Sequence, residues 1–383
     1  MKRNAFLLSI LGGFVNTSLL ANRKRQLPAA NGERASGRAE QLAARLIEDS
    51  NATYFVAAAY LGDRLGLFKA MAGAGPLTGD QLAAKVGLDK RYVLEWLRAV
   101  AAAHYVDYRP KSNTFELPTE HIAVLVDEDS PVFSAGLIEA TVPDILMLHR
   151  VQAAFGTGKG ISYGDYPPET FDGIERFTKP DYRHRLTQAW LPSVPGIVER
   201  LSAGGTAADL GSGAGHASIA IARSFPKAKA FGFEPYAPSV ERARENARVA
   251  GLSDRVTFQT FDGIHVPGGS YDLITISHSL HHAGAPVSLL RSARQKLSPD
   301  GVFFIVEDRR SARLEDDIDS PRGGFYGVGL LECLPTALAE GGPGYGTGIT
   351  EPDIRELAAK AGFREVTRVL PDDPLLSFFA LRA

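Results

Sequence analysis

The carboxyl-terminal half of the chain alternates short apolar runs with longer amphipathic segments, starting after Gly204-Gly205. The apolar runs have the length of β-strands, and the segments between them carry apolar residues at helical spacing. Such alternation is typical of an α/β domain in which a mostly parallel sheet has helices on both faces. The predicted strands are TAADLG, KAFGFEP, VTFQTFD, YDLITISHSL, GVFFIVEDR, EVTRVLP and SFFALRA, and the predicted helices are 217–225, 238–251, 286–297 and 351–361.

The last two predicted strands, EVTRVLP and SFFALRA, are joined by the short sequence DDP. A parallel pair needs a crossover of roughly a dozen residues or more, so this connection allows only an antiparallel pair. We therefore expect residues 205–383 to form a Rossmann-like α/β domain whose sheet ends in one reversed strand.

The amino-terminal half shows mainly the helical pattern. Apolar residues recur at helical spacing across residues 39–72 and again in KRYVLEWLRAV, and Thr78 is a plausible helix cap. Gly87 predicts a tight turn, and two strand-like pieces, YVDYR and TFELP, flank the turn-forming residues 111–113. Helix, turn, helix and hairpin in this order predict a winged-helix domain over residues 39–130.

Residues 131–204 carry further helical patterns and are expected to form a connector. The Gly-, Tyr- and Pro-rich residues 156–170 predict a surface loop or lid, and the next helix should be interrupted at Pro192 and Pro195. Aromatic residues of this segment are candidates for sandwiching a flat substrate, with packing between helices as the alternative for each. They are Tyr163, Tyr166, Phe171, Phe177 and Trp190.

Residues 1–38 are expected to be a leader or a disordered extension. A basic start, an apolar run and then RKR have the outline of a signal peptide or a short membrane anchor through residues 1–22. Gly12-Gly13 and Asn16 make this run weak as a spanning helix. We expect a cytoplasmic protein that does not bind membranes, with export or anchoring as the minority alternative.

Composition narrows the classes of function. The 383 residues carry a formal net charge of −2, which supplies no electrostatic reason to expect a nucleic-acid partner. The single cysteine, Cys333, excludes a disulfide framework or a cluster of thiolates within one chain.

The run ADLGSGAGH at residues 208–216 follows an apolar strand and resembles a nucleotide-binding loop. A dinucleotide fingerprint requires G-x-G-x-x-G below a diphosphate, but His216 stands where the third glycine is needed. Asp209, two residues before Gly211, would repel a diphosphate and attract an ammonium group. The loop therefore favours S-adenosylmethionine, which carries an ammonium and a sulfonium but no phosphate.

Two further acids end the next two predicted strands. Glu234 is placed to accept hydrogen bonds from ribose hydroxyls, as acids also do in NAD proteins. Asp262 is placed to accept one from the adenine amino group, with Phe261 or Ile264 against the ring. A helix cap or a solvated turn is the alternative for each acid taken singly. Acids at the ends of three successive strands favour one shared binding site.

The motifs ADLGSGAGHAS, FGFEP, TFDGI, YDLITISHSLHH and LSPDGVFFIVED resemble, in this order, those of class I S-adenosylmethionine-dependent methyltransferases. Together with the winged helix, they make the chain similar to caffeate-type O-methyltransferases and their bacterial small-molecule relatives. This resemblance implies a seven-stranded methyltransferase sheet, S-adenosylmethionine as cofactor, a small-molecule substrate, and a homodimer formed through a winged helix that does not bind DNA. It also implies a cofactor site made of Asp209, Gly211, Ser212, Gly213, Gly215, Glu234, Pro235, Phe261, Asp262, Gly263 and Ser277.

A hydroxyl nucleophile needs a base to take its proton. In the caffeate-type relatives a histidine after the fourth strand has this role and a carboxylate after the fifth lies beside it, which implies His281 and Glu307 as the catalytic residues. His282 stands where those enzymes usually have an acid, and a histidine without a role in proton transfer is the alternative for His281. With His278, these residues form a short histidine cluster, but no carboxylate motif converges on it, so we expect solvated histidines and no metal.

These observations predict methyl transfer to a hydroxyl group of an aromatic or polyketide-like metabolite. One alternative is an N- or C-methyltransferase without a histidine base. Another is a DNA-binding regulator that senses the cofactor, because Lys90, Arg91 and Arg98 lie on the would-be recognition helix. Glu95 lies among them, and the helix lacks the basic stripe that phosphate contacts need, so we expect no nucleic-acid partner.

Overall fold

The computed structural model describes residues 33–383, so most of the predicted leader or extension, including the possible anchor, lies outside the described residues. The chain folds as two compact units. The first contains the described residues up to Val142 together with Glu169–Pro180, and the second contains Pro143–Pro168 and Asp181–Ala383. The predicted connector 131–204 is thus divided between the two units. Within the described part of the chain, no helix has the length and apolar character needed to cross a bilayer.

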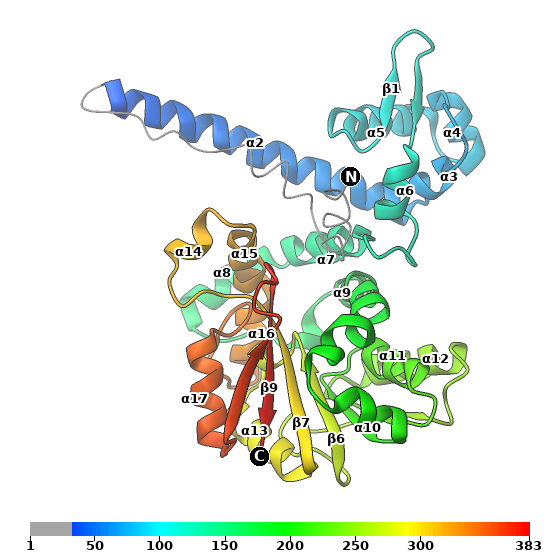
Figure 1. Ribbon diagram of the computed structural model, residues 1–383. Helices are drawn as coiled ribbons and strands as arrows, with labels where there is room; N and C mark the ends of the chain where they lie inside the picture. Colours follow the sequence, from blue (N-terminus) through cyan, green and yellow to red (C-terminus); the bar gives the residue numbers. More distant parts are fainter. Residues whose placement is uncertain (1–32) are drawn as a thin grey trace, which may run out of the picture. The chain divides into compact units, whose positions relative to one another are not determined.

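The first unit contains the predicted winged helix (Figure 1). A capping box at Thr78 starts α4 (Gly79–Val86), and Gly87 ends it in the left-handed conformation with φ 68°. Helix α5 (Lys90–Ala102) and the antiparallel strands β1 (Asp107–Arg109) and β2 (Thr114–Glu116) follow. The predicted order of helix, turn, helix and hairpin is confirmed.

The remaining helices of this unit are α2 (Glu33–Arg64), α3 (Leu67–Met71), α6 (Thr119–Leu125), and most of α7 (Ala135–Leu146) and α9 (Pro168–Asp181). Helix α2 includes Ser36 and Gly37, which we expected to be disordered. That expectation is wrong because the alanine, glutamate and arginine residues of this segment are strong helix formers that outweigh a single glycine.

The second unit is built on a seven-stranded sheet with the order β5-β4-β3-β6-β7-β9-β8. All neighbouring pairs are parallel except those of β9, which is antiparallel to both β7 and β8. The prediction of one reversed strand at the end of the chain is therefore confirmed. The strands are β3 (Thr206–Leu210), β4 (Lys229–Glu234), β5 (Val256–Thr260), β6 (Tyr271–Ser277), β7 (Leu297–Asp308), β8 (Glu365–Val369) and β9 (Leu376–Arg382).

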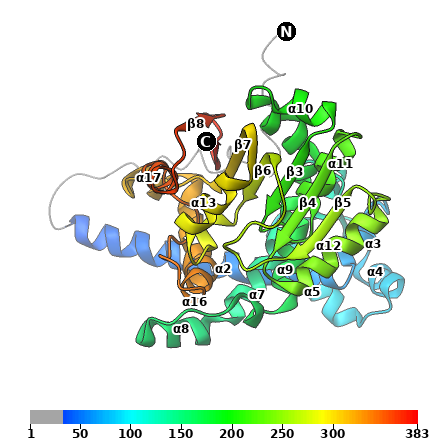
Figure 2. The same cartoon turned by 90° about the horizontal axis from the view of Figure 1, so that it is seen from below.

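Helices lie on both faces of this sheet, as predicted (Figure 2). The four helices predicted between the strands are α11 (His216–Ser224), α12 (Ala237–Val249), α13 (Pro286–Lys296) and α17 (Glu351–Ala361), each within two residues of its predicted bounds at either end. The others are α8 (Leu148–Thr157), η1 (Tyr163–Asp165), η2 (Tyr182–Trp190), η3 (Leu191–Ser193), α10 (Ile197–Ala203), η4 (Leu280–His282), α14 (Glu315–Ile318), η5 (Pro321–Gly324), α15 (Phe325–Val328), η6 (Gly329–Cys333) and α16 (Leu334–Ala339). The predicted interruption at Pro192 and Pro195 separates η2 from α10.

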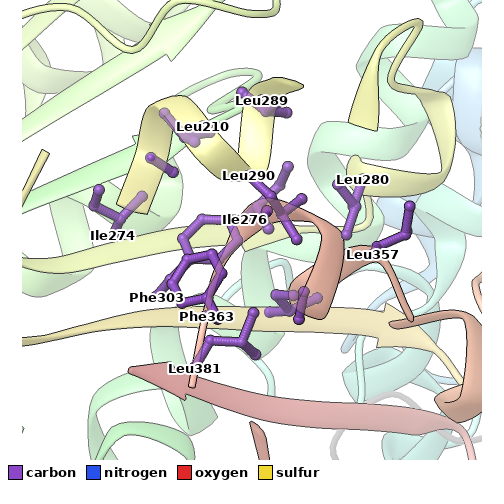
Figure 3. Packing of buried hydrophobic residues seen from close by; sticks show 14 of the residues in the cluster. Leu210, Ile274, Ile276, Leu280, Leu289, Leu290, Phe303, Leu357, Phe363 and Leu381 are labelled. Atoms are coloured by element: carbon purple, nitrogen blue, oxygen red, sulfur yellow. The ribbon is translucent and has the colours of Figure 1, made fainter. Parts of the chain in front are cut away.

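The sheet is buried on both faces because successive residues of its strands point to opposite sides. In β7, Phe303 and Ile305 pack with α13 and α17 in one apolar cluster, part of which Figure 3 shows. Their neighbours Phe304 and Val306 pack with η2, α10 and α11 in another. Burial on both faces explains why β7 reads as a continuous apolar run rather than an alternating one.

The segment between α8 and α9 is held against α16 rather than projecting as a lid. The Ile161 N–H donates to the carbonyl of Pro335 at 3.0 Å, and Ile161 is buried. A Cβ added at Gly160 would lie 2.0 Å from the backbone nitrogen of Ala339, so the glycine permits this close approach. The predicted surface loop is therefore wrong in part, because the glycine serves packing as well as turning.

Candidate active site

The predicted glycine loop connects β3 to α11 and turns sharply at the carboxyl end of the sheet. Gly211, Gly213 and Gly215 have φ values of 64°, 49° and 84°, in the region that favours glycine. The N–H groups of Gly211 and Ser212 donate to the carbonyl of Phe233 at the end of β4, at 2.8 and 3.1 Å. The loop is thus fixed to the neighbouring strand before any ligand binds.

Two buried carboxylates, Asp209 and Glu234, lie under this loop. Asp209 accepts a hydrogen bond from the Thr275 hydroxyl at 2.7 Å, and burial raises its pKa to about 7, with a further contribution from Glu234. Glu234 accepts hydrogen bonds from the N–H groups of Gly213 and Tyr236, both at 3.0 Å. Burial raises the pKa of Glu234 as well. Because these donors are neutral, the charge of the pair is left for a ligand to balance.

The loop leaves both space and an unused polar atom for a ligand. A Cβ added at Gly213 would meet nothing within 4 Å, whereas one at Gly211 would lie 2.5 Å from the Ser279 hydroxyl oxygen. The Ser212 hydroxyl is buried without a hydrogen-bond partner among the residues that the structure describes. A buried polar group without a partner costs free energy, so a polar ligand at the tip of the loop would stabilise it. The loop therefore fits a group with an ammonium or hydroxyl function.

The other predicted cofactor residues follow the ends of β4, β5 and β6. Asp262 is half exposed and accepts hydrogen bonds from the N–H groups of Ile264 and His265, which hold its pKa at about 2. Its other oxygen lies 2.6 Å from Nδ1 of His265, so the carboxylate makes the turn that we expected as the alternative for Asp262. Gly263 forms the turn at φ 75°, near Pro235, the ring of Phe261 lies 6.2 Å from that of Phe233, and Ser277 ends β6, where it is buried.

The two predicted catalytic residues are in direct contact. His281 lies on η4, just after β6, and its Nδ1 is 2.6 Å from Oε2 of Glu307, near the end of β7. The side chains are 2% and 0% exposed, respectively, so the expectation of a solvated histidine is wrong for His281. Burial opposes a charge on His281, but the Glu307 carboxylate outweighs it and raises the pKa of the imidazole. This pair can hold a proton that arrives at the outer nitrogen, Nε2.

Two further histidines flank this pair and differ in their protonation state. His278 lies 3.2 Å from Asp308, and although burial lowers its pKa, the carboxylate raises it to about 9. Nδ1 of His282 is 2.7 Å from the Thr336 hydroxyl oxygen, and burial together with the neighbouring His281 lowers its pKa far below the usual value. His278 is thus a cation and His282 a neutral ring at neutral pH.

The structure adds site residues that the sequence reasoning missed. Glu332, Cys333 and Thr336 come from η6 and α16 and lie beside the histidines, where Glu332 favours a charge on His281. Asp308, the partner of His278, was also missed, although it directly follows the predicted Glu307 in the sequence. No local signal marks Glu332, Cys333 or Thr336, because only the fold brings residues 332–336 to the end of β6.

The proposed aromatic sandwich is not assembled as we expected. Trp190 is fully buried and packs on Phe378, and the Tyr166 hydroxyl donates to the carbonyl of Leu331 at 2.7 Å. Tyr163 lies beside the histidines, with its ring 6.4 Å from that of His282 and 5.7 Å from that of Tyr236. Phe171 and Phe177 belong to the first unit.

Two family models match separate parts of the chain. Residues 55–127 match the Rv2258c-like winged helix-turn-helix domain, and residues 201–322 match a methyltransferase domain. The second match contains the glycine loop, both buried acids and the histidine–glutamate pair.

Individual relatives agree with these assignments. The chain is 31% identical over 179 residues to the methyltransferase GfsG of Streptomyces halstedii, a match covering 45% of this chain and 60% of that protein. It is 32% identical over 141 residues to the 27-O-demethylrifamycin SV methyltransferase of Amycolatopsis mediterranei, covering 35% and 51% of the two chains. The chain thus spans between half and two thirds of each of these two curated relatives. The solved mitomycin 7-O-methyltransferase shares the fold, with a TM-score of 0.68, 20% identity, and 92% of this chain and 100% of that chain covered.

Proposed function

Because the chain joins a winged-helix domain to a class I methyltransferase domain, we propose that it transfers a methyl group from S-adenosylmethionine to a hydroxyl group of a small molecule. The observation that carries this proposal is the buried His281–Glu307 pair, placed in the same methyltransferase domain as the glycine loop. Two relatives whose names specify an acceptor oxygen act on positions 27-O and 7-O of rifamycin- and mitomycin-type metabolites. An aromatic or polyketide-like acceptor is therefore the substrate class we propose here.

The acidic pair under the glycine loop supports this cofactor. Asp209 and Glu234 are both buried and receive hydrogen bonds from neutral donors, so a cationic ligand would balance their charge and a diphosphate would be repelled. S-adenosylmethionine supplies a methyl group already activated by the positive sulfur. We propose that Asp209 favours its ammonium group, that Glu234 holds the ribose, and that the loop residues Gly211, Ser212, Gly213 and Gly215 lie against the rest, with Pro235, Phe261, Asp262, Gly263 and Ser277 near the adenosine.

The histidine pair supports a hydroxyl acceptor. Glu307 accepts a hydrogen bond from Nδ1–H of His281. The lone pair on Nε2 is therefore available to take the proton of the acceptor hydroxyl. The imidazolium formed in this step is stabilised by the adjacent carboxylate. An N- or C-methyltransferase would have less need of this arrangement, because many amines and carbanions are nucleophiles without a base.

The amino-terminal unit supports the proposed homodimer. Leu46, Ile47, Tyr54 and Leu61 of α2 are large apolar side chains that are each more than half exposed. Ile47, Tyr54 and Leu61 recur every seven residues, so they lie along one stripe of the helix. A second copy of the chain would cover such a stripe.

Neither DNA nor a membrane is needed in this proposal. The cations of α5 have acidic neighbours, since Lys90 pairs with Asp80, and Arg91 and Arg98 both pair with Glu95. They are therefore poorly placed to contact phosphates. A methyltransferase that uses S-adenosylmethionine works where this cofactor is made, so we propose a cytoplasmic location.

Binding calorimetry tests the cofactor assignment. The wild type should bind S-adenosylmethionine, and Asp209→Asn should weaken this binding at least about tenfold, because it removes a buried charge next to the ammonium site. Glu245→Gln is the matched control, since this acid lies exposed on α12 and pairs with its helix neighbour Arg248. If the wild type bound neither S-adenosylmethionine nor its demethylated product S-adenosylhomocysteine, the proposed function would be wrong.

A further inference from the structure

Three buried or half-buried side chains with metal-ligating atoms meet beside the catalytic pair. One ligand atom from each of His281, His282 and Cys333 lies within 4.8 Å of the other two. We propose that these residues bind a divalent transition-metal cation of the zinc class. The binding itself stands on this geometry alone, whereas its effect on turnover, argued below, rests on the proposed function.

Both histidines use Nδ1 in a hydrogen bond, which leaves Nε2 for a metal. The hydroxyl of Thr336 donates to the carbonyl of Glu332 at 2.9 Å, so it accepts a hydrogen bond from Nδ1–H of His282 at 2.7 Å. Nδ1 of His281 likewise donates to Glu307 at 2.6 Å. Each ring therefore carries its proton on Nδ1 and keeps a lone pair on Nε2. A carboxylate or hydroxyl oxygen behind the far nitrogen is the usual partner of a histidine that binds a metal.

The sulfur atom is held only by weak contacts. Sγ of Cys333 is 3.6 Å from a carboxylate oxygen of Glu332 and 3.4 Å from the Thr347 hydroxyl. Glu332 is itself 7% exposed, and Sγ of Cys333 is its one hydrogen-bond partner among the side chains that the structure describes. A cation at this point would therefore also lie next to a buried acid that it could neutralise.

The donor atoms select the class of metal. Two imidazole nitrogens and one thiolate suit zinc and its neighbours, whereas magnesium and calcium require oxygen ligands. Tetrahedral bonds of about 2.0 Å to nitrogen and about 2.3 Å to sulfur place ligand atoms roughly 3.5 Å apart. Since the three ligand atoms lie within 4.8 Å of one another, metal binding requires only a small approach of these side chains. The fourth position is left for water or for a carboxylate oxygen of Glu332.

Metal binding would compete with the proposed proton transfer. The cation would bond to Nε2 of His281, the atom that takes the proton of the acceptor hydroxyl. The Cys333 thiol would lose its proton to solvent as the metal–sulfur bond forms, and His281, whose pKa Glu307 raises, would release any proton held on Nε2, whereas the neutral His282 binds without losing one. The site would therefore act as a reversible inhibitory site on the methyltransferase.

Cobalt(II) is a spectroscopic probe for the site. The full-length protein is treated with a chelator, dialysed and titrated with cobalt(II) chloride, with zinc chloride added afterwards as a competitor. The wild type should take up one cobalt per chain with a thiolate-to-cobalt charge-transfer band in the near ultraviolet, and zinc should displace it. Cys333→Ser should abolish the band, and His282→Asn should weaken cobalt binding at least about tenfold. The control His149→Asn changes an exposed histidine on α8 and should behave as the wild type.

Two results would overturn the proposed site: no charge-transfer band in the wild type, or a band that persists in Cys333→Ser. Circular dichroism of each variant identifies any that fails to fold, and the two ligand variants test the site independently. Failure of the metal site and failure of the proposed function give different results. If the wild type binds cobalt but transfers no methyl group, the metal site stands and the proposed function is wrong. Where methyl transfer is measured, micromolar zinc should inhibit the wild type, a chelator should restore it, and the Cys333→Ser enzyme should be insensitive to zinc.

Discussion

Replacing Glu307 by glutamine is the sharpest test of how the proposed base works. The carboxylate is fully buried and lies 2.6 Å from Nδ1 of His281. The glutamine side chain has nearly the same shape, but it carries no charge and can donate a hydrogen bond to Nδ1. The imidazole would then carry its proton on Nε2, so the lone pair would face away from the acceptor.

The size of the effect follows from the charge that the pair must hold. With about 4 Å between the charge centres and an effective dielectric constant of about 20, Coulomb's law gives an attraction of about 4 kcal/mol between imidazolium and carboxylate. Losing this attraction in the transition state corresponds to a decrease of about 10³ in kcat. The change of tautomer acts in the same direction, so we expect a decrease between about 10³ and 10⁴.

The assay is release of S-adenosylhomocysteine at saturating cofactor, with a phenolic acceptor chosen from hydroxylated naphthoates and flavonoids that the wild type methylates. Binding of S-adenosylmethionine, measured by calorimetry, should change little, because Glu307 lies at the proposed base and not under the glycine loop. Glu245→Gln, which changes an exposed acid on α12 outside the proposed site, is the control, and its kcat should equal that of the wild type. A folded Glu307→Gln enzyme with kcat within about threefold of the wild type would refute the proposed role of the pair.

Three further predictions concern the glycine loop, the buried acid and α2. Because burial raises the pKa of Asp209 to about 7, the folded state keeps its proton when the unfolded chain has already lost it, so stability should fall by up to about 4 kcal/mol between about pH 4 and pH 7. Affinity for the cationic cofactor should rise from pH 6 to pH 8 in calorimetry, and a wild type with the same pH dependence as Asp209→Asn would contradict this. In urea denaturation, Gly211→Ala should lower the free energy of unfolding by about 1–3 kcal/mol more than Gly213→Ala does. The reason is that a Cβ at position 211 would lie 2.5 Å from Ser279, whereas a Cβ at position 213 would meet open space. Equal losses of stability would contradict the assigned packing. Tyr54→Glu should halve the mass measured by light scattering, because Tyr54 lies in the exposed apolar stripe of α2, and an unchanged mass would place the interface elsewhere.

Sequence patterns predicted the sheet well and the shape of the site only in part. Strands such as β7 and helices such as α17 follow from local apolar periodicity, which survives in the fold because both faces of the sheet are covered. The contact between His281 and Glu307 was also within reach, since the carboxyl ends of adjacent parallel strands meet at one edge. Packing between residues far apart in the sequence could not be predicted in this way. Whether Trp190 lines a pocket or the core depends on Phe378, which lies 188 residues later in the chain.

The departure from the family pattern at position 282 shows how such long-range contacts change a site. Where the resemblance implies an acid after the base, this chain has a neutral histidine tied to Thr336. An acid is nevertheless present, because η6 brings Glu332 close enough to favour a charge on His281. The charge that assists the base has thus moved from the base's own turn to a separate helical element, next to Cys333. One ligand atom from each of two imidazoles and a thiol lies within 4.8 Å of the others at this point, so the residues around the proposed base also supply the ligands of the proposed metal site.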